Sequence, residues 1–305
     1  MSESNRVRIA IRPDGSSSNW KTLRRTNDAL TAGTNTTRSE NVRSDRMRDG
    51  QKITTITVGG TLNIEMTAAE YDDLIAAAMC STWTADTPTA GTDQITVGTT
   101  TTKFEVLKSY LDEDRHILMS GMEVGQLELN MDSGSKITGT VTFMGTQEDH
   151  EYDPSTDTFD PASDALFFDS SNNLSSVTID GSPLSGIAIT GMSMTINNNH
   201  QTDQELGTQY QTHHKGSADI TTSKTVRMSA SAFDLWKNTL TNTPIATSFT
   251  MGDGSNSYVF SQGREFLSGD APSGGLDAIL TFTLNGVSAV DATGEMLTIE
   301  RTLAP

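Results

Sequence analysis

The sequence contains two similar segments, 162 positions apart, that each join a strand pattern to a helix pattern. Residues 66–74 read MTAAEYDDL, and residues 228–236 read MSASAFDLW. Alternating apolar residues precede both segments, which predicts a half-buried strand before each helix. Two amphipathic helices can look alike by chance, but the shared flanking strands favour duplication of a structural module. This feature points to a fold built from two related units rather than to an active site.

Both helices are expected to begin after a hydroxyl side chain. Thr67 and Ser229 are natural N-caps, because their oxygens can accept a hydrogen bond from a free first-turn amide, and Glu70 would complete a capping box. Residues at helical spacing predict a buried stripe on the first helix, made of Tyr71, Leu74, Ile75, Ala78 and Met79. A thinner stripe follows on the second helix, made of Phe233, Trp236 and Leu240. We predict that these stripes pack the helices on the outer face of a sheet.

Composition indicates a mainly β protein. Hydrophobic residues make up only 34% of the 305 residues, and Thr, Ser, Asn and Gly are frequent, which suits short strands with polar faces. Strand patterns follow each helix, at 95–97 and 103–107 in the first copy and at 246–250 and 257–260 in the second. Each half therefore predicts the order strand, helix, strand, turn, strand.

The length and the duplication together predict two domains joined by a linker. The first domain is predicted at residues 1–147, with a basic N-terminal arm and loop, and the second at residues 173–305. Residues 148–172 hold eight acids, two prolines and no Lys or Arg, which is typical of a solvated linker. Calcium binding is the alternative interpretation, but the Asp-x-Asp-x-Asp-Gly spacing is missing.

The net charge of −18 is unevenly distributed. Residues 1–50 hold ten Lys and Arg against six Asp and Glu, whereas the remaining residues hold eleven against thirty-three. Nucleic-acid binding by the basic arm is one interpretation, although Trp20 is its only stacking residue. Self-association is the more economical one, because a basic arm can meet the acidic body of another copy. Two long polar loops, 31–52 and 197–217, occupy equivalent places in the two halves and suggest a contact used twice.

The search for catalytic chemistry finds no recognised pattern. The five His form no metalloprotease motif, and a nucleophile elbow, a phosphate-binding loop and a dinucleotide fingerprint are all missing from the sequence. The single cysteine, Cys80, excludes an intrachain disulfide. We therefore expect no enzyme activity, no metal and no cofactor. No signal peptide or apolar span of membrane length is found, so a soluble protein folded in a cytoplasm is expected.

Several motifs, in order along most of the chain, resemble the major tail-tube proteins of long-tailed bacteriophages, of the siphophage type. They are residues 25–28 (RTND), 38–46 (RSENVRSDR), 60–66 (GTLNIEM), 71–78 (YDDLIAAA), 140–145 (TVTFMG), 177–181 (VTIDG) and 197–199 (NNN). Residues 84–102 and the acidic linker match nothing in that family pattern.

The resemblance implies two tandem β-sandwich or half-barrel tube domains, each with one flanking helix. Copies would assemble into a ring-shaped β-barrel, and stacked rings would form the tail tube that carries DNA into the host. Three chains would supply six domains for a pseudo-hexameric ring, and six chains would be needed if one half alone lined the channel. The virion tail, assembled in the bacterial cytoplasm, would be its location.

The same resemblance implies the partners and the interfaces. The partners would be further copies, the tape-measure protein and phage DNA in the lumen without sequence-specific binding, and the tail terminator and tail tip proteins. A channel wall lined by cations would bind DNA tightly. The acidic wall of this protein would instead repel DNA weakly and let it slide. The interface between rings or subunits is predicted at Arg38, Glu40, Arg43, Asp45, Arg46, Arg48, His213 and His214. Another β-rich virion exterior protein, such as a capsid decoration protein or an adhesin module, is the alternative, but it would require neither duplication nor a basic arm.

Overall fold

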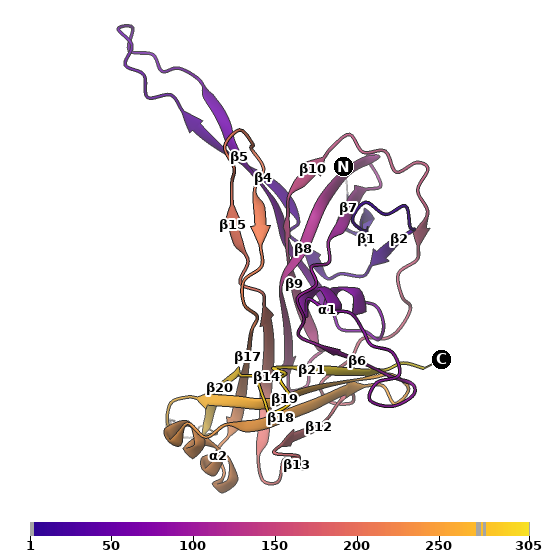
Figure 1. The fold of residues 1–305 in the computed structure, drawn as a ribbon, viewed down its shortest axis with the longest axis vertical. Coiled ribbons are helices and arrows are strands. Elements are labelled where there is room, and N and C mark those ends of the chain that lie inside the picture. Colours follow the sequence, from indigo (N-terminus) through magenta and orange to yellow (C-terminus); the bar gives the residue numbers. More distant parts are fainter. Residues whose placement is uncertain (1–2, 273–275, 277–278, 305) are drawn as a thin grey trace.

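A computed structural model of the chain describes residues 3–272, 276 and 279–304, and it is mainly β (Figure 1). The first ten strands are β1 Val7–Pro13, β2 Trp20–Leu23, β3 Asn27–Asp28, β4 Thr31–Arg38, β5 Gln51–Glu65, β6 Thr92–Thr96, β7 Phe104–Tyr110, β8 Arg115–Asp132, β9 Thr138–Gly145 and β10 Gln147–Asp149. The others are β11 Phe159–Asp160, β12 Leu174–Ile179, β13 Ser182–Pro183, β14 Ala188–Asn197, β15 Gln201–Asp203, β16 Thr212–His214, β17 Asp219–Arg227, β18 Ile245–Gly252, β19 Ser257–Ser268, β20 Thr281–Ser288 and β21 Thr298–Thr302. The helices are the 3-10 turn Ser4–Arg6, α1 Asp72–Ala78 and α2 Ala230–Thr241.

The strands of the two halves pair in the same antiparallel order. In the first half the order is β1, β7, β8, β9, β5, β4. In the second half it is β12, β18, β19, β20, β17, β14. Strand β14, at the edge of the second series, also pairs with the second part of β8, and this pairing joins the two series. The described residues form an open sheet without a closed barrel, and the predicted domain boundaries stay a prediction.

Strand β8 turns the corner between two sheets. Its first part pairs with β7 and β10, and its second part pairs with β9 and β14. Gly121 lies between these parts with φ +63, and a Cβ there would stand 2.1 Å from the Thr146 hydroxyl oxygen. Only glycine fits that position without strain, so this residue allows one 18-residue strand to serve both sheets.

The main core contains residues from both halves. Leu62, Ile64 and Tyr71 belong to the same buried cluster as Phe249 and Tyr258. A smaller core lies under α2 and is made of Val226, Ala232, Leu235, Ile245, Leu267, Phe282 and Leu284. Alternation along the strands explains both clusters, because every second side chain points inward.

The acidic segment 148–172 packs against the first half instead of forming a freely solvated linker. Phe168 is 1% exposed, and the ring of Phe159 stacks on that of Trp20 with centroids 6.3 Å apart. The Trp20 indole N–H donates to Asp157 over 2.8 Å. The segment packs against the first half because its aromatic side chains bury apolar surface there, which its acidic side chains cannot do.

The two helices begin differently from one another. Ser229 is the N-cap of α2, as predicted, and its oxygen accepts a hydrogen bond from the Ala232 N–H over 3.0 Å. The predicted cap at Thr67 is wrong, because α1 begins only at Asp72. The Thr67 hydroxyl donates to the Glu65 carbonyl, and Ala69 at φ +61 interrupts the helical path.

The two polar loops are hairpins. Strands β4 and β5 form a long ribbon that projects from the body, and β15 and β16 form a second hairpin beside it (Figure 1). Gln204 ties the two together through hydrogen bonds to Thr54 and Thr55. Extended Thr-rich sequence favours this ribbon over an irregular loop.

Candidate functional site

One face of the central sheet is polar along its whole width. Strands β9 and β17, with residues 61–65 of β5, 125–131 of β8 and 191–197 of β14, bury every second residue, and the residues between are half-buried or exposed. Strand register places hydroxyl and amide side chains side by side in continuous rows across the sheet. One row contains Asn63, Thr140, Glu128, Thr195 and Thr221, and the next contains Glu65, Thr138, Asn130, Ser193 and Ser223.

Acids outnumber cations on this face. The acids are Glu65, Glu128, Asp132 and Asp219, and the cations are Lys136 and Arg227 at the margin. Lys136 is itself ion-paired with Glu65. A surface of this kind offers hydrogen bonds but no grid of free cations, so it would repel a polyanion weakly.

The tip of the β4–β5 hairpin carries the predicted arginine cluster. Arg43 is paired with Asp45 over 2.6 Å and with Asp49 over 2.8 Å, and this contact lowers the pKa of Asp45. Within the described residues, the side chains of four tip residues make no ion pair: Arg38, Glu40, Arg46 and Arg48. Val42 is fully exposed and Met47 is 67% exposed. The tip is therefore held by one internal network and leaves cationic and apolar side chains for a partner.

The predicted histidines separate on β16. The His213 ring donates to the Gly145 carbonyl over 3.0 Å, and burial lowers the pKa of His213. His214 points to the other side and is exposed. His213 thus anchors the second hairpin to β9, and His214 is the one that faces solvent.

The predicted helix residues differ between the two halves. Tyr71, Leu74 and Ile75 are each at most 2% exposed, and burial together with Glu70 raises the pKa of Tyr71 to about 12. Phe233 and Trp236 are only half-buried, and α2 instead buries Ala232 and Leu235. Leu240 is 69% exposed, contrary to the predicted stripe. The predicted stripe is therefore shifted by one residue from the buried face of α2, which contains Ala232 and Leu235.

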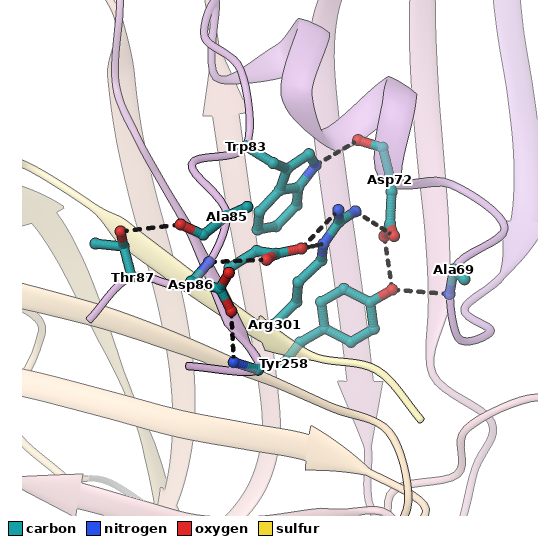
Figure 2. Close-up of polar contacts among 10 residues, drawn as sticks. Ala69, Asp72, Trp83, Ala85, Asp86, Thr87, Tyr258 and Arg301 are labelled. Carbon is teal, nitrogen blue, oxygen red and sulfur yellow. Dashed lines mark hydrogen bonds and ion pairs between the residues drawn. The ribbon is translucent and has the colours of Figure 1, made fainter. Parts of the chain in front are cut away.

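A buried polar cluster connects α1 to the second half (Figure 2). The Arg301 guanidinium donates to Asp72 over 2.6 Å and to Asp93 over 2.9 Å, and it lies 4.3 Å from the centroid of the Trp83 ring. The Tyr258 hydroxyl donates to Asp72 over 2.6 Å and accepts from the Ala69 N–H over 2.8 Å. Burial raises the pKa of Asp72, although its partners oppose that shift. Breaking a buried pair of this kind typically costs about 3 to 5 kcal/mol.

Composition predicted strands with polar faces, but sequence reasoning did not align them on one face of one sheet, and it missed this cluster. The alternation of Thr, Ser and Asn with apolar residues along these strands was the pattern from which the polar face could have been predicted. Asp72 and Arg301 are 229 positions apart, and nothing in their surroundings predicts that they meet.

Among residues 3–272, 276 and 279–304, no group of three or more His, Cys, Asp or Glu is placed to hold a metal ion. In the same part of the chain, no helix has the length and apolarity needed to cross a bilayer.

A comparison with curated proteins finds no match. A family model described as phage tail tube protein matches residues 4–295, which is nearly the whole chain. The tail-tube motifs, the mainly β fold and the polar sheet face agree with that match. The chain belongs to the phage tail tube protein family and is a structural component of the virion tail.

Proposed function

We propose that three copies of this tail tube protein close each ring of the tube, with the polar sheet face lining the channel. The observation that carries the proposal is the identical pairing order in the two halves. If each half is one tube domain, three chains supply the six domains of a pseudo-hexameric ring. Six chains per ring is the alternative, in which only one half lines the channel.

Two free strand edges support the closure. Inside the chain, β14 of the second half pairs with the outer edge of β8. The matching strands, β3 and β4, pair only with β5 among the described residues. Strand β19 matches β8, and its pairing with β18 ends at Glu265. Beyond Glu265, only residues 266–268 of β19 are unpaired on that side within the described chain, so β4 of the next copy would begin its pairing there, and closing the ring would cover both edges.

The polar face explains the transport role. Hydroxyl and amide side chains would keep the channel wall hydrated. The excess of acids would prevent the tight binding of DNA that rows of cations cause through counterion release. DNA would then move along the channel without a preference for sequence. The tape-measure protein would occupy the same channel before DNA enters.

The projecting hairpin suits contacts between rings. Its tip presents Arg38, Arg46 and Arg48 beyond the body of the molecule, where a neighbouring ring would lie. The acidic body of that ring supplies opposite charge. At the ends of the tube, the tail terminator and tail tip proteins would contact the same surfaces, and assembly would take place in the host cytoplasm.

Reaction with maleimides of different size tests the assignment of the lumen. Thr138→Cys places a thiol on the polar face, and Leu166→Cys places one at an 83% exposed position outside the strands of that face. Cys80 is buried and gives a low background. In assembled tubes we expect a bulky maleimide polymer to label Cys at position 166 but not at 138, whereas unassembled protein reacts at both. Equal labelling of both positions in tubes would exclude the polar face as the lumen wall.

A further inference from the structure

The outward side of α2 lacks the cover that α1 has. Leu240 and the Asp234 side chain are each 69% exposed, and Asp234 pairs with Lys237 of the same helix. On α1, the matching acid Asp72 is 6% exposed and is held by Tyr258 and Arg301 from the second half. We propose that, in the ring, this side of α2 docks on the β8–β10 corner of the next copy, with Asp234 in the place of Asp72.

The register of the strands identifies the docking corner. The β7–β8 pairing shifts between Phe104 and Val106, and the β18–β19 pairing shifts between Ile245 and Thr247. When these two bulges are aligned, Met122 of β8 corresponds to Glu265 of β19. Counting seven residues back along each strand, Arg115 then corresponds to Tyr258. An offset of 143 residues between the halves follows, and the β9 and β20 pairings give the same offset.

The same register finds the second member of the pair. In the second half, Tyr258 of β19 lies opposite Arg301 of β21. Strand β10 pairs with β8 from Gln147 and Ser120 to Asp149 and Leu118, and Tyr152 and Arg115 each lie three residues beyond the end of this pairing. Both residues line one cavity of about 230 Å³. Each site therefore has one tyrosine and one arginine. In the second half the tyrosine is on β19 and the arginine on β21, whereas in the first half the arginine is on β8 and the tyrosine follows β10.

The chemistry of this corner fits the side chains that α2 presents. Arg115 is exposed and has no ion-pair partner among the described residues, so its guanidinium is available for Asp234. Tyr152 lines the same cavity, and its hydroxyl donates to Asp157 over 2.7 Å and accepts from Arg12 over 3.3 Å. Asp114, Glu151 and Asp153 also line the cavity, and Lys237 of α2 would face these acids. Opposite charges are thus available on both sides of the contact.

Only a second copy can make this contact. Helix α2 lies at the lower end of the molecule, and β10 lies in the upper part of the body, beside the N-terminus (Figure 1). The intrachain contact of α1 supplies the geometry, since a pseudo-sixfold ring repeats each junction between domains alternately within and between chains. The inference rests on the proposed function, because without a ring of two-domain chains the two surfaces have no reason to meet.

Charge reversal with rescue tests the contact. Asp234→Arg and Arg115→Asp should each lower the fraction of protein in rings at least tenfold, measured by light scattering at fixed concentration. The double variant should recover to within threefold of the unmodified protein. Asp164→Arg, at another exposed acid, is the matched control and should form rings normally. Circular dichroism checks folding in every variant.

A disulfide provides an independent readout. Asp234→Cys combined with Arg115→Cys should form linked dimers and trimers on oxidation, whereas each single variant should not. Normal rings in both charge-reversed proteins, or a double variant no better than the single ones, would overturn the inference while leaving the ring intact. If the unmodified protein forms no rings at all, the proposed function fails instead.

Discussion

At the scale of single residues, the second half depends on a buried ion pair. Lys224 and Glu265 have side chains that are 2% and 0% exposed, and their charged atoms are 2.5 Å apart. The hydroxyls of Thr222 and Thr247 also donate to the Glu265 carboxylate. Gly286 makes room for it, because a Cβ there would overlap the carboxylate oxygen. The carboxylate is therefore fully engaged in a site closed to water.

This pair predicts a dependence of stability on pH. Burial alone would raise the pKa of Glu265, but Lys224 and the hydrogen bonds outweigh it and hold that pKa below its ordinary value of 4.5. The unfolded chain then takes up the proton first as pH falls, so this contribution is complete above about pH 4.5 and is lost as pH falls through the folded-state pKa. Glu265→Gln should reduce the free energy of unfolding at pH 7 by about 3 to 5 kcal/mol, since Lys224 loses its counter-charge.

Urea denaturation at pH 7 and at successively lower pH measures both effects. The variant should lose less stability than the unmodified protein between pH 5 and pH 3. Glu295→Gln, a change at a half-buried acid without an ion pair among the described residues, serves as the control. Parallel curves for the unmodified protein and Glu265→Gln would show that the pair does not couple folding to protonation.

At the scale of secondary-structure elements, the two helices share a sequence pattern but differ in environment. Helix α1 is enclosed, with Asp72, Leu74, Ile75, Ala77 and Ala78 all buried, whereas α2 buries only Ala232 and Leu235. Second-half strands cover α1 within the chain, and nothing in the described chain covers the outer side of α2. Helical periodicity locates an amphipathic element, but it does not indicate how much of the apolar stripe the fold covers.

Truncation of the matching aromatics measures this difference. Tyr71→Ala should lower the free energy of unfolding by about 3 to 5 kcal/mol, because a fully buried aromatic and its hydrogen bond to the Arg24 carbonyl are lost. Phe233→Ala should cost the unassembled protein clearly less, since its ring is half-exposed. Asp73→Ala, at a 58% exposed side chain, should change stability by about 0 to 1 kcal/mol. Thermal unfolding in dilute solution provides the comparison, and equal losses at positions 71 and 233 would contradict it.

The sequence predicted the elements more reliably than their surroundings. Alternation in residues 220–228 and the Ser229 cap were sufficient to predict a strand followed by a helix in the second half. The position of the first cap was not predictable, because the left-handed turn at Ala69 has no glycine to mark it. The ion pair of Asp72 with Arg301 was also beyond prediction, since it depends on how strands from opposite ends of the chain pack.

At the scale of the whole molecule, polar and apolar side chains lie on opposite faces of the sheet. One sheet face is wet and weakly acidic, the core face is dry, and the hairpin extends beyond both (Figure 1). The net charge of −18 keeps separate copies apart, whereas the cationic tip provides one place of opposite sign. Assembly is therefore expected to be directional.

Reversal of charge at the tip tests that direction. Arg38, Arg46 and Arg48 changed together to Glu should leave the circular dichroism spectrum unchanged but stop rings from stacking into tubes. Each exposed pair contributes only about 0 to 1 kcal/mol, but the pairs recur in every copy. Arg43→Glu should in addition loosen the tip itself, since Arg43 holds Asp45 and Asp49. Tubes of normal length from the triple variant, in electron micrographs, would assign these arginines to solvent alone.

The mass of an isolated ring tests the central claim most directly. Native mass spectrometry of rings released from tubes at low concentration counts the chains in each ring without reference to any contact. Three copies are predicted, because the two halves repeat one order of strand pairing and six such units would close a pseudo-hexameric barrel. A ring of six copies would contradict the account, since only one half of each chain could then line the channel.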